Sequence, residues 1–138
     1  MEGAIPSTFI AESIAKHQSK TSIGAHQIFL GQVREDEIDG KKVKSIEYSA
    51  YTEMAEQVIH NIREEAFRKF DLTCMHIYHS LGKVNVGEIC FFVFVSSAHR
   101  QACFDACSHL VNEVKSKAPI FGKEILEDES FQWKVNKA

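Results

Sequence analysis

A short polar and basic stretch follows the longest apolar run of the chain. Ser96-Ser97-Ala98-His99-Arg100 comes directly after residues 89–95, where a buried strand would end and a helix begin. The first backbone N–H groups of a helix have no partner within the helix and attract anions. Arginine adds a planar guanidinium that matches phosphate or carboxylate. The spacing therefore predicts an anion site in which His99 and Arg100 take part.

The same residues admit a simpler role. Ser97 is of a type that caps helices, and His99 and Arg100 would then be hydrated side chains of the first helical turn. A cation in the first turn opposes the helix dipole, which favours a functional reason for Arg100. The local sequence leaves both interpretations open.

Four more cationic positions accompany this stretch. Lys115 and Lys117 fall in the last turn of the expected helix, where the dipole favours cations, and Lys123 lies a few residues beyond. Arg34 ends an expected strand beside the acidic residues 35–37, where a surface ion pair is the simpler interpretation. Residue types alone do not rank these four cations.

Sulfur and imidazole groups recur along the same helix. His99, Cys103 and Cys107 follow one another at four-residue spacing. Zinc sites normally take ligands from more than one segment. The two cysteines also share their spacing with Leu110 and Val114, as core positions do. We therefore expect no metal site and no cysteine nucleophile here.

Length and composition limit the classes of protein open to this chain. Its 138 residues suit one domain, and 44% apolar and 25% charged residues are typical of a folded protein. A net charge of −3 gives no overall attraction to nucleic acid or to a membrane surface. The run 89–95 is too short to span a bilayer, and no secretory signal is visible. The four cysteines are then expected to be reduced core thiols of a cytosolic protein.

Hydrophobic periodicity predicts the elements that must position these residues. The first half should begin with a helix over 7–16, capped by Ser7 or Thr8. A hairpin of strands 25–34 and 43–51 should follow, with its turn at Asp39-Gly40. Next should come a helix over 53–70, with a core face formed by Met54, Val58, Ile62 and Ala66. The second half should hold a strand over 72–80, turns at 82 and 85–87, a central strand over 89–96, a helix over 98–117, and a loop leading to a short final strand. Hairpins mixed with helices favour an α+β fold.

With these motifs in order, the chain resembles the large, catalytic subunit of molybdopterin synthase. The resemblance covers about residues 24–133, nearly the whole chain. Several motifs in sequence make it far more specific than any one of them. The segments that carry it are Gly24-Ala25, Phe29-Leu30-Gly31-Gln32-Val33-Arg34, Ile46-Glu47-Tyr48-Ser49-Ala50-Tyr51, Met54-Ala55-Glu56, His79-Ser80-Leu81-Gly82, Val86-Gly87-Glu88, Val95-Ser96-Ser97-Ala98-His99-Arg100, Val114-Lys115-Ser116-Lys117-Ala118-Pro119-Ile120-Phe121 and Lys123-Glu124.

The resemblance implies a fold, partners and a reaction. The fold would be a hammerhead-like α+β domain over residues 1–138 with a mixed or antiparallel sheet, hairpins and three main helices, and with residues 1–6 and 136–138 flexible. Two copies would form a central dimer, and each would bind a small ubiquitin-like β-grasp subunit whose Gly-Gly tail carries a thiocarboxylate. Two sulfur transfers from such tails would convert cyclic pyranopterin monophosphate to molybdopterin. No cofactor or metal is implied.

The resemblance also implies roles for particular residues. Lys115 would be the catalytic lysine, near the thiocarboxylate. Arg34, His99 and Arg100 would bind the phosphate and other anionic groups of the substrate. Glu124 would lie in the substrate-binding tail segment.

One position departs from the family pattern. A basic residue is usual three positions after the proline, and this chain has Gly122 there, with Lys123 one residue later. We expect Gly122, Lys123 and Glu124 to border the substrate, with Lys123 as a second catalytic lysine if it takes the place of the missing basic residue. The alternative is a module that binds the β-grasp partner or a pterin without efficient catalysis.

Helix geometry adds a constraint to this site. Arg100 and Lys115 lie on one helix, and at about 1.5 Å per residue they are about 22 Å apart along its axis. A small pterin cannot bridge that distance. We therefore expect a composite site, in which His99 and Arg100 of one subunit complete the site around Lys115 of its dimer mate.

Overall fold

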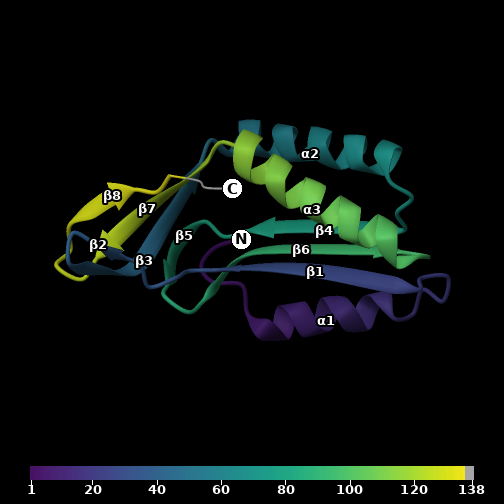
Figure 1. The fold of residues 1–138 in the computed structure, drawn as a ribbon, viewed down its shortest axis with the longest axis horizontal. Helices are drawn as coiled ribbons and strands as arrows, with labels where there is room; N and C mark the ends of the chain where they lie inside the picture. The colour runs from purple at the N-terminus through teal and green to yellow at the C-terminus, as the bar shows by residue number, and fades with distance from the viewer. Residues whose placement is uncertain (136–138) are drawn as a thin grey trace.

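The computed structural model describes residues 1–135, which form two antiparallel sheets connected by two long helices, with a third, shorter helix at the start of the chain (Figure 1). The prediction that residues 136–138 are flexible concerns positions outside the described residues. In chain order the elements are α1 Ser7–His17, β1 Ala25–Gln32, β2 Glu37–Ile38, β3 Lys41–Ala50, α2 Thr52–Lys69, β4 Cys74–His79, β5 Gly82–Asn85, β6 Ile89–Ser97, α3 Arg100–Lys117, β7 Ile120–Leu126 and β8 Phe131–Trp133.

The first sheet has the strand order β1-β6-β4 and is covered on both faces. Figure 1 shows α2 and α3 above this sheet and α1 below it. Side chains of a strand alternate between faces, so Phe92 and Phe94 of β6 pack with residues of α1, whereas Phe91, Val93 and Val95 join the main core under α2 and α3. This explains why β6 is apolar without interruption, and it confirms the predicted central strand.

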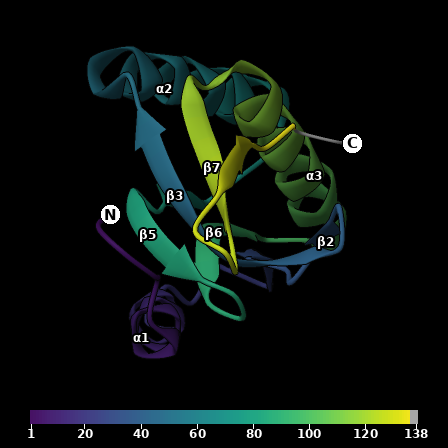
Figure 2. The same ribbon diagram turned by 90° about the vertical axis from the view of Figure 1, so that its left-hand side faces the viewer.

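The second sheet lies at one end of the first and extends away from it (Figure 2). Its order is β2-β3-β7-β8, and β5 pairs with β3 beside β2. Ile46 and Val84, both at most 1% exposed, turn their side chains into the same core as β6. Every pair of strands described is antiparallel. The α+β prediction is confirmed.

The predicted hairpin between 25–34 and 43–51 is wrong. The turn at Asp39-Gly40 forms with φ values of 50° and 78°, but it joins β3 to the two-residue strand β2. β1 instead pairs with β6, from Ala25 opposite Ser97 to Gln32 opposite Ile89. An Asp-Gly turn determines only the pairing of the residues next to it. The buried strand β6, by contrast, needs a hydrogen-bonded strand on each edge, and β1 occupies one of these edges.

Two further segments form strands where turns or a loop were expected. Residues 82–85 form β5 and residues 120–126 form β7, because both pair with the long strand β3. Neither segment has the apolar alternation that identifies a strand from sequence. The strand β8 confirms the predicted short final strand.

Helix ends and one helix face also differ from expectation. Pro6, rather than Ser7 or Thr8, is the N-cap of α1. In α2, Met54 is 58% exposed and Ala55 is buried, because the face that packs on the core runs through Ala55, Ile62 and Ala66. The predicted face is confirmed for Ile62 and Ala66.

The first six residues were expected to be flexible and are instead attached to the sheets. The Gly3 N–H donates to the Leu81 carbonyl over 2.8 Å, and the Ile5 N–H donates to the Ile89 carbonyl over 2.9 Å. Ile5 is 2% exposed and belongs to the cluster of Phe92 and Phe94. The apolar contact beneath α1 therefore extends to the start of the chain.

A glycine at the start of β1 provides a test of this arrangement. A Cβ at Gly24 would overlap the carbonyl oxygen of Ala98, a backbone atom that no rotamer change can remove. We expect Gly24→Ala to lower the free energy of unfolding by about 3 kcal/mol in urea titrations. Gly40→Ala is the control, since its Cβ meets nothing but its φ of 78° costs an alanine about 1 kcal/mol. Equal stability of the two variants would contradict the contact of residues 24 and 98.

Candidate functional site

A cavity lies where the two sheets meet the C-terminal end of α3. Its volume is about 360 Å³, and Lys115, in the last turn of α3, forms part of its wall. The other lining residues come from α3 and the residue after it, from β1, β3, β4, β6 and β7, and from the end of β8 with the residue that follows it. They are Gly31, Gln32, Tyr48, His79, Cys90, Phe91, Val114, Ser116, Ala118, Ile120, Phe121, Gly122, Trp133 and Lys134.

Lys115 stands in a partly desolvated position. Over the whole residue it is exposed, but the walls of the cavity remove water from its ammonium group, which lies 5.8 Å from the centre of the Phe91 ring. This burial lowers the pKa of Lys115, and the positive charge of Lys134 lowers it further, while Cys90 acts in the opposite direction. A lysine with a lowered pKa exchanges a proton more readily at neutral pH.

Three residues that the sequence analysis did not select form the floor of the cavity. The Tyr48 hydroxyl donates to Cys90 Sγ over 3.4 Å, and the thiol of Cys90 donates to the Gly31 carbonyl over 3.4 Å. The Tyr48 ring meets the His79 ring edge-on at 4.9 Å. The signal for these residues is weak, because each lies alone in an ordinary strand and the three meet only when both sheets are assembled.

Two of the floor residues, Tyr48 and His79, are electrically neutral at neutral pH. Burial lowers the pKa of His79 to about 4, against a hydrogen bond from Nδ1 to the Ser80 carbonyl that acts in the other direction. Burial also raises the pKa of Tyr48 far above its usual value. The cavity therefore joins these two neutral side chains to a cationic wall.

A second cavity of about 570 Å³ adjoins the first and shares Lys115, Trp133 and Lys134 with it. Arg34 lines it, and its Nε lies 2.6 Å from Asp36 Oδ1, which raises the pKa of the arginine. The predicted surface ion pair of Arg34 thus forms, and the side chain stays 80% exposed.

Glu124 gives the second cavity a buried carboxylate. It is 6% exposed and accepts a hydrogen bond from Gln132 Nε2 over 3.3 Å. The fold therefore brings Arg34, Lys115 and Glu124 to one cavity from three distant parts of the sequence.

Gly122 and Lys123 lie on opposite faces of β7. Gly122 faces the first cavity, where a Cβ would be 3.1 Å from Ile46 Cγ2 and 3.3 Å from Tyr48 Cε1. Lys123 faces outward, with Nζ 4.0 Å from the centre of the Phe131 ring, and lines neither of the cavities of Lys115. Because neighbours in a strand point to opposite faces, the expected approach of Lys123 to Lys115 is not formed.

His99 and Arg100 lie at the far end of α3 from Lys115. His99 is the N-cap, Arg100 is the first helical residue, and both side chains are exposed. Ser97 does not cap the helix; its hydroxyl donates to the His99 carbonyl. Within one chain, neither basic residue lines the two cavities at Lys115.

The cysteines of α3 are core residues, as their spacing predicts. The Cys103 side chain is fully buried, with Sγ 3.0 Å from Ser97 Oγ. Burial raises the pKa of Cys107 to about 11, so its thiol is a poor nucleophile. All four cysteines are free and buried.

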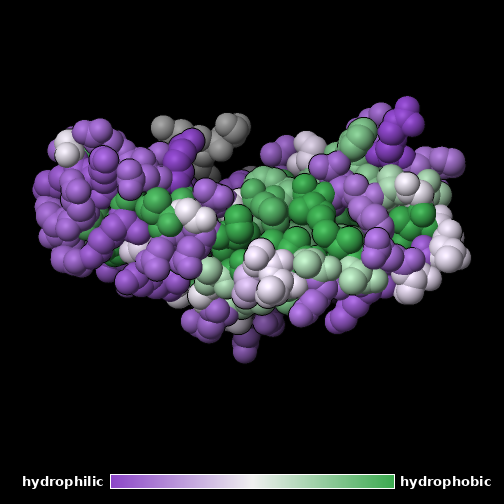
Figure 3. All heavy atoms as spheres, turned by 90° about the horizontal axis from the view of Figure 1, so that it is seen from below, coloured by the Kyte–Doolittle hydropathy of each residue, from purple (hydrophilic) through white to green (hydrophobic). Residues whose placement is uncertain are grey.

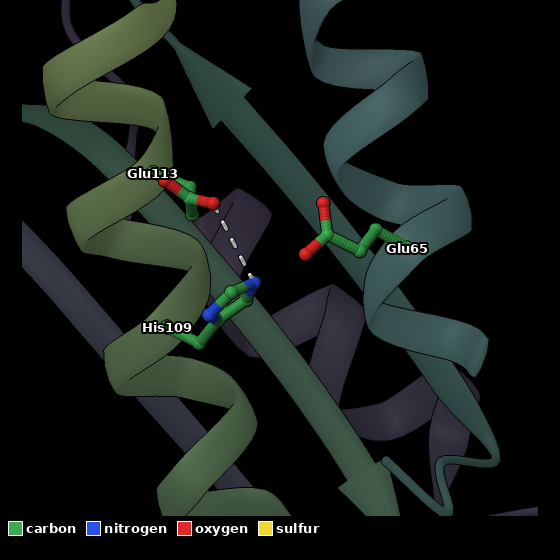
Figure 4. Close-up of side chains that lie close together, drawn as sticks. All are labelled: Glu65, His109 and Glu113. Carbon is green, nitrogen blue, oxygen red and sulfur yellow. Dashed lines mark ion pairs between the residues drawn. The ribbon is translucent and has the colours of Figure 1, made fainter. Parts of the chain in front are cut away.

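One group of possible metal ligands joins α2 and α3 elsewhere. Glu65, His109 and Glu113 point toward one another, with ligand atoms within 4.8 Å (Figure 4). Lys117 Nζ already lies 3.0 Å from Glu113 Oε1, and Glu65 contributes to the raised pKa of that lysine. We interpret the group as polar side chains that link the two helices.

Comparisons with known proteins agree with this architecture. The sequence profile of the MoaE protein family matches residues 6–117. A molybdopterin synthase catalytic subunit of Pyrococcus abyssi is 37% identical over 126 residues, which are 91% of this chain and 84% of that protein. The chain belongs to the molybdopterin synthase catalytic-subunit family. The resemblance seen in the sequence is confirmed.

Other members of this family support the same assignment. The catalytic subunit from Homo sapiens is 42% identical over 114 residues, and the match covers 83% of this chain and 60% of the human protein. A crystal structure of molybdopterin synthase from Staphylococcus aureus aligns with a TM-score of 0.77 and 34% identity, over 83% of this chain and 82% of that chain.

A further structure shows the fold alone. A complex of subunits 1 and 2 of the molybdopterin-converting factor from Helicobacter pylori aligns with a TM-score of 0.83 at 17% identity, over 100% of this chain and 90% of that chain. Within residues 1–135, no helix is long and apolar enough to cross a membrane.

The buried His79 predicts a pH dependence of stability. Its pKa is about 4 in the folded chain and about 6.5 when exposed, so between these values only the unfolded chain binds the proton. The free energy of unfolding should therefore fall as the pH falls from 6.5 to 4, by up to about 3 kcal/mol from this residue. His79→Gln should make the fall shallower in urea titrations.

The same substitution at an exposed histidine, His60→Gln, is the control. His60 has a 61% exposed side chain on α2. His60→Gln should therefore leave the slope as in the unsubstituted protein. An identical slope for His79→Gln and His60→Gln would show that His79 is not the group responsible.

Proposed function

We propose that this chain catalyses sulfur transfer to cyclic pyranopterin monophosphate, forming molybdopterin. The observation that carries the proposal is the position of Lys115, whose desolvated ammonium stands at the wall shared by two cavities. One cavity would receive the thiocarboxylate tail of a small β-grasp subunit, and the other would hold the substrate. The proposed reaction needs no cofactor, because the partner supplies the sulfur.

The chemistry requires a cation at this wall. In each transfer, the thiocarboxylate sulfur forms a bond to a carbon of the substrate while the oxygen group on that carbon leaves and takes up a proton. Water then cleaves the acyl carbon–sulfur bond, which leaves a carboxylate on the tail and a thiolate on the substrate. Lys115 would stabilise the negative charge of the attacking and leaving groups or move a proton between them. Its lowered pKa supports either role.

The second cavity offers complementary groups for the substrate. The Arg34 guanidinium, which is exposed beside Asp36, suits a phosphate. The buried carboxylate of Glu124 is an acceptor for the N–H donors of a pterin ring. Gly122 leaves the first cavity open beside Tyr48.

A second copy of the chain would supply His99 and Arg100. β1 is an edge strand, and an apolar groove of about 490 Å³ runs between it and α3. Figure 3 shows apolar side chains gathered along the middle of this side of the molecule, while hydrophilic ones cover the end formed by β2, β7 and β8. Leu30 and Phe104, which line the groove, are 42% and 47% exposed. Such an edge favours association with another strand.

Antiparallel pairing of β1 with its two-fold mate would explain the composite site. Ala25, at the start of β1, lies opposite Ser97 and so close to His99. Gln32, at its end, lines the cavity of Lys115. Antiparallel pairing sets the start of one β1 beside the end of the other, which brings the basic pair of one subunit to the Lys115 of the next.

The partner and location follow from the same proposal. The Helicobacter pylori protein of this fold forms a complex of two subunits of the molybdopterin-converting factor. We infer that this chain likewise binds a small β-grasp subunit, as the central dimer of a heterotetramer. Four unpaired cysteines support a reducing compartment, which we take to be the cytosol.

Replacement of Lys115 tests the proposed catalytic role. We expect Lys115→Ala to lower the rate of molybdopterin formation from cyclic pyranopterin monophosphate and thiocarboxylated small subunit by about 10²–10⁴-fold. Lys117→Ala is the matched control, since Lys117 lies two residues further along and pairs with Glu113 on the helix surface. It should change the rate by less than about twofold.

The control reaction also decides between enzyme and binding module. If the unsubstituted chain binds the small subunit and forms no product, the binding module is correct. In that case Gly122→Lys should restore turnover, although Ile46 and Tyr48 leave little room for a side chain there.

Mixed dimers test the composite site. His99→Ala and Lys115→Ala should each be nearly inactive alone, because every site of either dimer lacks one essential group. After equal mixing and exchange of subunits, half of the dimers are mixed and one of their two sites is intact, so about a quarter of the activity should return. No recovery after demonstrated subunit exchange would place both residues outside a shared site.

A further inference from the structure

Lys134 lies directly after β8 and is fixed beside Gly122. Its backbone N–H donates to the Gly122 carbonyl over 2.8 Å. A Cβ built on Gly122 would be 3.6 Å from the Cβ of Lys134. The absence of a side chain at residue 122 therefore leaves space next to the first carbon of the lysine side chain.

Strand alternation sets the direction of the Lys134 side chain. Gln132, two residues earlier, turns inward and donates to the buried Glu124. Trp133, between them, is 58% exposed, lies opposite Lys123 in the pairing of β7 with β8, and its ring meets the Phe131 ring edge-on. Lys134 thus shares the inner side with Gln132.

Lys134 lines the same two cavities as Lys115. Only Trp133 accompanies these two lysines in both linings, within the part of the chain that the structure describes. Two cations at one boundary repel each other, and an anion bound between them relieves that repulsion. The boundary is therefore suited to a phosphate or a carboxylate-like group.

We propose that Lys134 is a second cationic residue of the site and binds, together with Lys115, the anionic group of the ligand at the boundary between the two cavities. The identity of that ligand rests on the proposed function, whereas the pairing of the lysines does not. The lowering of the Lys115 pKa by the charge of Lys134 supports this arrangement. Among the described residues that line these cavities, the other titratable or charged groups are Arg34, Asp36, Glu37, Tyr48, His79, Cys90 and Glu124.

The test measures the reactivity of the Lys115 amine in the isolated chain, in the absence of any catalysed reaction. Trace labelling with acetic anhydride over a range of pH, followed by mass spectrometry, gives the pH midpoint at which Lys115 becomes reactive. We expect the midpoint to rise by about half a pH unit in Lys134→Gln, because one nearby positive charge is removed. Lys134→Arg should keep the original midpoint.

A matched control removes the same charge elsewhere. Lys83 is exposed on β5, at the outer edge of the second sheet, and lines neither cavity of Lys115. Lys83→Gln should leave the midpoint of Lys115 unchanged. Circular dichroism of each variant verifies that the fold is retained.

Inorganic phosphate serves as the anionic probe. It should protect Lys115 from labelling in the unsubstituted chain and in Lys134→Arg, and about tenfold more phosphate should be needed in Lys134→Gln. Equal midpoints in Lys134→Gln and Lys83→Gln would overturn the proposal, and so would equal protection by phosphate. A chain that passes both measurements but forms no molybdopterin would refute the proposed function and leave the anion site in place.

Discussion

The burial of β6 on both faces is the constraint on which the rest of the structure depends. A strand that is apolar on each side must be covered twice, and here α1 covers Phe92 and Phe94 while α2 and α3 cover Phe91, Val93 and Val95. The same strand needs an antiparallel neighbour on each edge, which β1 and β4 supply. Since α3 continues directly from β6, this packing also fixes where both ends of α3 lie.

The length of α3 separates His99 and Arg100 from Lys115. His99 and Arg100 stand at its start, and Lys115 stands in its last turn, where the second sheet meets the first. A rigid helix of 18 residues cannot bring its ends together, so within one chain these two groups stay apart. The exposed edge of β1 gives a physical reason why two copies would complete each other.

The second sheet decides which side chains reach the cavities. In β7 the alternation of faces turns Gly122 and Glu124 inward and Lys123 outward, although all three are adjacent in the sequence. On the neighbouring segment the same rule turns Lys134 inward. A cation is therefore present beside Gly122, but it comes from a strand partner and not from the next residue along the chain.

The sequence by itself determined the α+β class, the buried strand β6, the core stripe of α3 and the ordered motifs that identify the family, because each depends on local periodicity or on residues close in the chain. It also located Lys115. Only the tertiary structure decided that β1 pairs with β6, that β5 and β7 are strands, and that Tyr48, His79, Cys90 and Lys134 surround Lys115. Strand pairing joins residues far apart in sequence, and the alternation of faces then selects the side chains that meet, which no local pattern records.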